Sequence, residues 1–363
     1  MRKFTTLLNP VTLMKGFTRE DTLHPALSLV LLFVLVLTGA VVAFFLTLGI
    51  GAVSYGVTNQ DELSNIVASP AKYVYGWEVL MWMQGLTLLL GFGASAYILP
   101  IIRGQQPFDY FMPRRPVPLW WLLAAMVLVV VSVPAMSGFI AWNAEMHLPT
   151  WLYGFERWAR LKEDQAQELT TFLTRFTSSN RFLVAVLVVA VIPAIAEELT
   201  FRGVMLRQFT RWTGSVHWGV WLSAVVFSAI HAQFFGFIPR VVLGALLGYL
   251  FAWSGNLLVP IAGHFTQNFF QLLLLYLQQR GTIEFDADST EALPWYTMLV
   301  SAVLSFGLLY WLYQRREGAV APATTEIHTL TSKGIAVTAP AAGEAHTLSS
   351  TGVANAPGSS KSA

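Results

Sequence analysis

The chain has 363 residues, of which 55% are hydrophobic and only 12% charged, and its mean hydropathy is +0.56. Average soluble domains carry about 25% charged residues, so this composition excludes an ordinary soluble domain and indicates a polytopic membrane protein. The net charge of +2 excludes the strong positive field that a nucleic-acid partner requires. No cysteine is present, which excludes disulfides, cysteine-based zinc sites, a catalytic thiol and lipidation of this chain on cysteine.

The N-terminal segment, residues 1–25, lacks a compact apolar core followed by a small-residue cleavage site. We therefore expect a cytosolic segment and not a cleaved signal peptide. Eight apolar runs beyond it are candidates to cross about 30 Å of hydrocarbon. They cover residues 26–52, 78–102, 119–142, 182–205, 217–235, 238–254, 257–278 and 295–314. The predicted fold class is all-α, a polytopic membrane helix bundle of about eight transmembrane helices.

These runs also predict how the chain is divided. Residues 26–142 hold the first three transmembrane helices and residues 143–180 lie outside the membrane. Residues 181–280 form a core of four helices, and residues 281–316 contain the last transmembrane helix.

The positive residues that flank the runs predict the orientation, because lysine and arginine are enriched in cytoplasmic loops. With a cytoplasmic N-terminus, four inner segments are basic. Their basic residues are Arg2, Lys3, Lys15 and Arg19, then Arg103, Arg114 and Arg115, then Arg207 and Arg211, then Arg315 and Arg316. We therefore expect a multi-pass protein of the cell (inner) membrane with both termini in the cytoplasm.

One predicted outer loop, residues 143–181, does not follow this rule, since it carries several basic residues. Its sequence has the pattern of an amphipathic helix over residues 150–176. The residues available for the apolar side are Trp151, Leu152, Phe155, Trp158, Leu161 and Phe172. We expect this helix to lie on the membrane surface. The alternative is a connector that faces only water.

The C-terminal tail, residues 317–363, is rich in Ala, Thr, Ser, Gly and Pro. Within it, "EIHTLTSKGIA" at 326–336 recurs as "EAHTLSSTGVA" at 344–354. Such a tail cannot bury enough apolar area to offset its ordering entropy, so we expect it to be disordered. Its histidines, His328 and His346, are not expected to be catalytic.

Several ionisable or strongly polar residues fall inside the apolar runs. They are Glu197, Glu198 and Arg202 in the fourth run, His231 in the fifth, and His264 and Asn268 in the seventh. A charged group at bilayer depth costs roughly 2.5 to 3.5 kcal/mol, so these residues are candidates for a functional site. Each of them taken alone is more typical of helix packing than of a functional site.

Helical geometry distinguishes the two glutamates. Glu198 and Arg202 are four residues apart, so they share a face and can neutralise each other. Glu197 is turned by about 100° from Glu198 and is left without that partner. Pro193 lies four residues before Glu197 and removes the amide partner of the Val189 carbonyl.

Depth brings the candidate residues from three helices to one level. Glu197, His231 and His264 lie about 8 to 13 residues inside the predicted cytosolic edge, which is about 12 to 20 Å at 1.5 Å per residue. His264 and Asn268 share a face because they are four residues apart. Phe227 precedes His231 by the same four residues, so its ring is expected one turn before the imidazole. The pattern therefore predicts a shared pocket within the membrane.

The same residues form three ordered motifs. "EELTFR" (197–202) has the form EExxxR, "FSAIH" (227–231) the form FxxxH, and "HFTQN" (264–268) the form HxxxN. In this order on predicted transmembrane helices, they resemble the CPBP or Abi family, which comprises type II CAAX prenyl endopeptidases and bacteriocin-processing or immunity proteins. The resemblance covers about residues 181–280, and no motif position departs from the pattern.

The chemistry of these residues fits peptide hydrolysis, which needs a base for water and donors for the oxyanion. A carboxylate held away from water is a strong base, which suits Glu197. His231 can hold the same water, and His264 and Asn268 can donate to the oxyanion. The resemblance implies the same four roles, with Glu198, Arg202 and Phe227 as supporting residues.

The expected substrate is a peptide bond in a membrane-associated peptide or lipidated protein, and the other expected partner is the lipid bilayer. No nucleic acid is expected, and no oligomeric state is specified. The resemblance leaves both a metal-free glutamate-type protease and a metalloprotease open. Glu197, His231 and His264 could form a zinc ligand set with an open fourth position. The metal-free form, without cofactor, is favoured because no HExxH motif is present and Asn268 is an unusual zinc ligand.

Two other classes of function are compatible with buried charges. A transporter or proton relay also needs them, although no inverted repeat relates the two halves of the membrane region. A non-catalytic immunity or scaffold protein of the same family is the second alternative. The complete set of motif residues favours retained activity over this reading.

Overall fold

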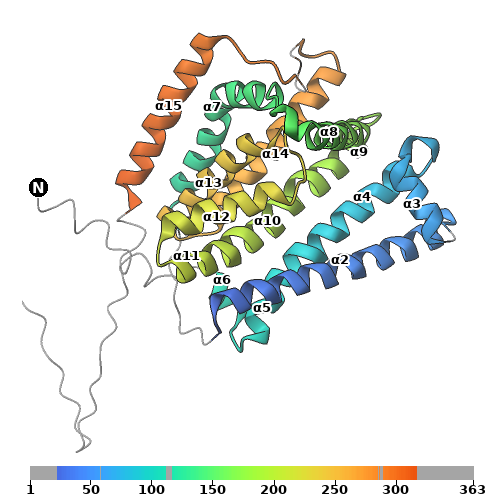
Figure 1. The fold of residues 1–363 in the computed structure, drawn as a ribbon, viewed down its shortest axis with the longest axis horizontal. Helices are drawn as coiled ribbons and strands as arrows, with labels where there is room; N and C mark the ends of the chain where they lie inside the picture. Colours follow the sequence, from blue (N-terminus) through green and yellow to red (C-terminus); the bar gives the residue numbers. More distant parts are fainter. Residues whose placement is uncertain (1–22, 58, 112–116, 285, 287–288, 317–363) are drawn as a thin grey trace, which may run out of the picture. The chain divides into compact units, whose positions relative to one another are not determined.

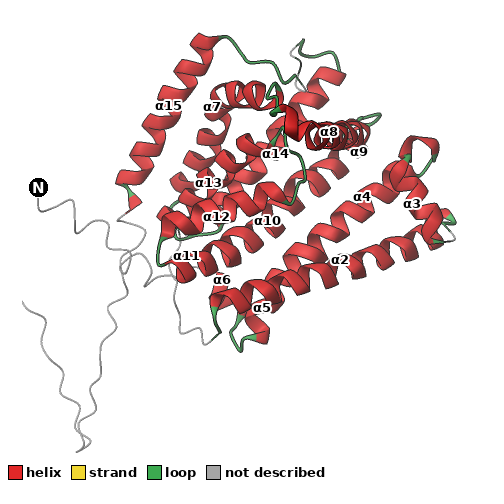
Figure 2. Cartoon of the chain, in the orientation of Figure 1, coloured by secondary structure: helices red, strands yellow, loops and turns green. Residues whose placement is uncertain are grey.

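The computed structural model describes residues 23–316 except 58, 112–116, 285 and 287–288. Across these residues the chain is helical and contains no strand (Figure 2). The predicted all-α fold class is confirmed. The tail 317–363, with its repeat and its two histidines, and most of the predicted cytosolic N-terminal segment lie outside the described residues.

Helices occupy all eight predicted apolar runs (Figure 1). The single helices are α2 (Pro25–Tyr55), α7 (Leu119–Ala144), α12 (Val216–Ala229), α13 (Phe237–Ser254), α14 (Leu258–Gln279) and α15 (Trp295–Gln314). The second run forms α4 (Gly76–Leu86), η2 (Thr87–Ala94) and α5 (Ser95–Ile102). The fourth forms α9 (Ser179–Ala185), η4 (Val186–Val191), α10 (Ile192–Glu198), η5 (Leu199–Leu206) and α11 (Arg207–Thr213).

Six of these continuous helices in the described part are long and apolar enough to cross a membrane, rather than eight. α12 is the clearest difference. With 14 residues it is about 21 Å long, which is less than the hydrocarbon thickness. It ends just before His231, in the middle of the run predicted at 217–235. α14 is not among the six either.

The long helices contain π-helical segments and prolines that disturb the backbone hydrogen bonds. Side chains of neighbouring helices bond the disturbed carbonyls, as hydrocarbon requires. Thr200 Oγ1 donates to the Phe92 carbonyl within η2, at 3.0 Å, and Ser223 Oγ donates to the Phe201 carbonyl within η5, at 2.9 Å. Next to Pro134 in α7, Ser301 Oγ donates to the carbonyl of residue 131 and accepts from the amide of residue 135. These bonds fix the register between helices.

Small residues allow α12 and α13 to pack closely. A Cβ atom added at Gly244 would lie 3.1 Å from the Ala224 Cβ, and one at Gly248 would lie 2.9 Å from a Val220 methyl. The two glycines are four residues apart, which is the spacing of close helix contacts in membranes. This contact positions the end of α12, and therefore His231, against α13.

The predicted extramembrane segment contains the expected helix, α8 (Tyr153–Leu173), preceded by the short η3 (Thr150–Leu152). In Figure 1 α8 is seen nearly end-on, so it runs across the direction of the long helices. Its far end is tied to α4, since Trp77 Nε1 donates to the Leu173 carbonyl at 2.9 Å. Large apolar side chains on η3 and α8 are exposed, namely Trp151 on η3 and Tyr153, Phe155, Trp158 and Leu161 on α8. Contact of this surface with the membrane stays a prediction.

Candidate active site

Glu198, the last residue of α10, is the most buried acid of the candidate site. Its Oε1 accepts one hydrogen bond from Arg202 Nη1 at 2.6 Å and another from His264 Nδ1 at 2.8 Å. The predicted ion pair with Arg202 is therefore confirmed. Arg202 in turn donates Nη2 to the Gly244 carbonyl at 2.9 Å. Because both side chains are almost fully buried, these bonds replace part of the water that the two charges have lost, while Glu198 Oε2 is buried without a hydrogen-bond partner among the described residues.

Glu197 is also buried and faces a different edge of the same imidazole. Its Oε2 lies 3.8 Å from His264 Nε2. Arg202 pairs with Glu198 and not with Glu197, as expected, and the His264 ring lies between the two adjacent glutamates. Nδ1 of His264 carries the hydrogen that Glu198 accepts, so Nε2 presents a lone pair towards Glu197 in the neutral ring.

Phe227 brings the second imidazole to the same place. The Phe227 ring centroid is 5.1 Å from that of His231 and 6.0 Å from that of His264, both in edge-on geometry. The Arg202 guanidinium lies over the same ring at 5.0 Å. His231 Nδ1 donates to the Phe227 carbonyl at 2.8 Å, so its Nε2 is also the unprotonated nitrogen in the neutral ring. Side chains from η5, from α14 and from the loop after α12 thus surround one phenyl ring.

Asn268 lies one turn after His264 on α14 and contacts the backbone of the glutamate helix. Its Nδ2 donates to the Val189 carbonyl at 3.1 Å. This is the carbonyl that would bond residue 193 in an α-helix, where proline has no amide hydrogen. Asn268 therefore ties α14 to the disturbed turn that precedes Glu197. The amide nitrogen has two hydrogens, and this bond uses one of them.

Two polar features of the site were not predicted from the sequence. The first is the role of Glu198 as acceptor for His264, which a contact between distant helices creates. The second is Arg240 on α13, which lies within electrostatic range of both Glu197 and His231. A lone arginine in the apolar segment "FIPRVVLGALL" was the available signal. Its position near the start of a predicted span made it resemble an ordinary flanking charge.

The metalloprotease alternative requires three side chains that lie close enough together to bind one metal ion. Glu197 and the Nε2 lone pairs of His231 and His264 are chemically suitable donors. Within the described ranges, however, no group of three or more histidine, aspartate or glutamate side chains lies close enough together to hold a metal ion. The arrangement as it stands therefore does not fit a three-ligand zinc site.

An apolar cavity of about 320 Å³ borders the turn that carries the two glutamates. It lies between the second and fourth runs of helix. The residues that line it are Leu89, Gly93, Ala94, Tyr97, Ile192, Ile195, Ala196 and Leu199. Ala196 and Leu199 directly flank Glu197 and Glu198 in the chain.

Comparison with known proteins finds a family match for part of the chain. Residues 179–270 match the family model described as type II CAAX prenyl endopeptidase Rce1-like. A 91-residue stretch is 32% identical to the uncharacterized protein YpbD of Bacillus subtilis (strain 168), covering 24% of this chain and 43% of that protein. No solved structure matches the chain significantly.

The matched region begins with α9, ends within α14 and contains all three motifs as well as the Glu198–His264 contact. The CPBP-type resemblance of the motifs agrees with it. Residues 179–270 are thus similar to an Rce1-like domain of the type II CAAX prenyl endopeptidase family, and they lie in a multi-pass membrane protein.

Proposed function

We propose that this protein is an intramembrane endopeptidase that hydrolyses a peptide bond in a membrane-associated peptide or lipidated protein. The observation that carries the proposal is the buried contact of Glu197 with His264, whose ring is oriented by a second glutamate. The Rce1-like domain supports a protease of the CAAX type. That the physiological substrate is a peptide or protein of this kind is part of the same proposal.

In the proposed mechanism Glu197 is the base that deprotonates the attacking water. A water molecule about 2.8 Å from each atom fits between Glu197 Oε2 and His264 Nε2, which are 3.8 Å apart. Both atoms accept hydrogen bonds, so the water would point its hydrogens at them and its lone pairs at a substrate carbonyl. Glu197 then delivers the proton to the leaving amine.

The remaining residues support this step. Glu198 holds the His264 ring in place and stabilises the imidazolium that forms while His264 Nε2 holds the proton taken from the water, before that proton returns through Glu197 to the leaving amine. The imidazolium Nε2–H and the second Asn268 N–H are the proposed donors to the oxyanion. In this proposal His231 is a second imidazole that can transfer protons. Arg202 and Phe227 hold the two imidazole rings in position.

We propose the metal-free form of this chemistry, supported by the ligand geometry described above. Elemental analysis of active protein is the corresponding measurement. We expect full activity in protein that contains less than one equivalent of zinc, with no loss after treatment with a chelator. Activity that rises and falls in proportion to bound zinc would contradict the metal-free form.

Purified protein in liposomes, assayed with an internally quenched membrane-inserted peptide, tests the function as a whole. We expect cleavage by the wild-type protein and its loss in the Glu197→Ala and His231→Ala variants. The exposed Glu168→Ala variant serves as control for a change of charge. Accumulation of intact peptide inside the liposomes, without cleavage, would instead indicate a transporter.

A further inference from the structure

The short loop that contains His231 has a conformation that the loop itself does not favour. Residues 231–236 connect α12 to α13, and Ala232 has a φ angle of 52°. A residue with a Cβ atom rarely adopts this left-handed region, and such strain persists only where the surroundings hold it. The contacts that hold this loop therefore also fix the residue next to Ala232, which is His231.

The surface helix α8 supplies these contacts through Glu163. One carboxylate oxygen of Glu163 accepts from Gln233 Nε2 at 3.3 Å, and the other accepts from the Phe235 amide at 3.2 Å. Gln233 Oε1 accepts from Arg240 Nη2 at 2.6 Å. The Gln233 amide is thus held from both sides, between an acid of α8 and the arginine that lies within electrostatic range of Glu197.

Ring contacts and a second helix hold the same loop. The Phe155 and Phe234 rings meet edge-on with their centroids 5.5 Å apart, and the Arg160 guanidinium lies 4.1 Å from the Phe235 ring centroid. Asn143, near the end of α7, accepts from the amide of residue 238 at 2.9 Å. The loop is therefore enclosed by α7 and α8.

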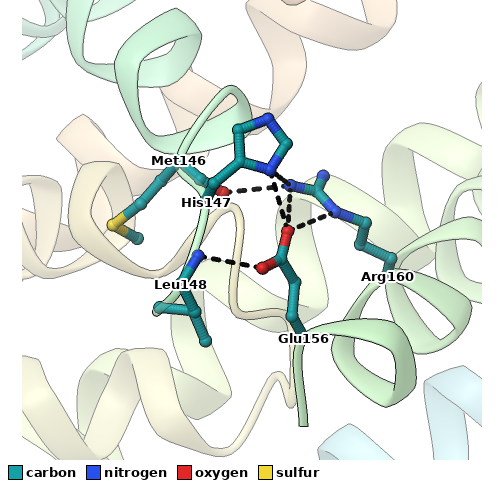
Figure 3. Close-up of polar contacts among 5 residues, drawn as sticks. All are labelled: Met146, His147, Leu148, Glu156 and Arg160. Carbon is teal, nitrogen blue, oxygen red and sulfur yellow. Dashed lines mark hydrogen bonds and ion pairs between the residues drawn. The ribbon is translucent and has the colours of Figure 1, made fainter. Parts of the chain in front are cut away.

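α8 can hold the loop because it is anchored itself (Figure 3). Glu156 accepts from the Leu148 amide at 2.9 Å, and its other oxygen accepts from Arg160 at 2.9 Å and contacts His147 Nδ1 at 3.0 Å. The residues 156, 160 and 163 follow the i, i+4, i+7 spacing and share one face of the helix. One face of α8 thus joins the segment after α7 to the loop of His231.

We propose that Glu163 is a positioning residue, through which α8 holds the 231–236 loop and thereby fixes the His231 imidazole beside Phe227. The proposal rests on the proposed function for its effect on turnover. Its structural part, that Glu163 holds the loop, does not depend on which reaction the site performs.

Two Glu163 variants and one control test the proposal in full-length protein in liposomes. Glu163→Ala removes both acceptor oxygens, whereas Glu163→Gln keeps one oxygen that the Phe235 amide can still use. Glu168→Ala is the control, since this glutamate lies on the same helix and is exposed. The readouts are hydrogen exchange of residues 232–236, the rate of His231 modification by diethyl pyrocarbonate, and kcat and KM for the quenched peptide.

We expect Glu163→Ala to speed exchange of the Phe235 amide at least about 5-fold, the effect of one lost hydrogen bond. Modification of His231 should also become faster. kcat should fall about 10- to 100-fold, because a misplaced catalytic group costs this much, while KM changes less than about 2-fold. Glu163→Gln should restore part of the protection and part of kcat, and Glu168→Ala should resemble wild type.

Each result that differs from these expectations would contradict a different part of the proposal. Unchanged exchange and His231 modification in Glu163→Ala would show that Glu163 does not hold the loop. Faster exchange with unchanged kcat, or with a change in KM alone, would overturn the positioning role. If the wild-type protein cleaves no peptide, the proposed function fails, and the exchange and modification data still decide whether Glu163 fixes the loop.

Discussion

At the residue scale, the site depends on one carboxylate that serves two partners. Glu198 Oε1 accepts from both Arg202 and His264, and all three side chains are buried. A buried charge that loses its partner is strongly destabilising, whereas replacing a whole pair by apolar side chains is often neutral. Glu198 therefore contributes to stability through Arg202 and to the proposed reaction through His264, and these two contributions can be separated.

We expect Glu198→Leu to lower the free energy of unfolding by about 3 to 5 kcal/mol, because it leaves Arg202 buried without its partner. The double variant Glu198→Leu/Arg202→Leu should recover most of that loss. It should nevertheless stay impaired in kcat, since His264 still lacks its acceptor. Unfolding in mixed micelles and the peptide assay measure the two effects. A double variant with wild-type kcat would show that Glu198 does not orient His264.

At the element scale, α8 is held by an acid that lies outside the candidate membrane spans. The hydrogen bond from the Leu148 amide, followed by the bonds from Arg160, lowers the pKa of Glu156 from 4.5 to about 2. A glutamate with a lowered pKa in the folded state contributes stability above its unfolded pKa of 4.5, and this contribution is lost as the pH falls towards 2. The anchor of α8 is therefore intact at neutral pH.

We expect Glu156→Gln to lower the melting temperature by a constant amount above about pH 5.5. The difference from wild type should shrink as the pH falls from 4.5 towards 2, because wild-type Glu156 then becomes protonated as well. Melting curves of both proteins from pH 7 to pH 3 measure this. The exposed Glu168→Gln is the matched control. A difference that grows on acidification would contradict the lowered pKa.

At the scale of the whole molecule, local spacing predicted the helices and the Glu198–Arg202 pair, because both depend on residues within one or two turns. The ordered motifs indicated which three helices carry the site. The hydrogen bond between Glu198 and His264 joins residues that are 66 positions apart in the chain. The hydrogen bonds of Glu163 with the His231 loop join residues that are 70 and 72 positions apart. Such contacts depend on how helices cross, which periodicity does not encode. The early end of α12 likewise follows from the loop that α8 encloses.

The predicted topology is also a property of the whole molecule. It places α8 outside and the α11–α12 turn inside, and it rests on the positive residues of the inner segments. Because the chain has no cysteine, single cysteines at Glu168 and Trp212 report their own exposure. We expect a membrane-impermeant thiol reagent added to intact cells to label only the cysteine at 168. Labelling of the cysteine at 212 instead would reverse the orientation.

The central claim is that Glu197 is the base for water within the membrane. The single-turnover rate of peptide cleavage by Glu197→Gln, compared with wild type and with the control Glu168→Gln, tests it most directly. The proposed mechanism predicts a rate at least about 100-fold lower for Glu197→Gln, the lower limit for loss of a general base, and an unchanged rate for the control. Cleavage by Glu197→Gln at the wild-type rate would contradict it.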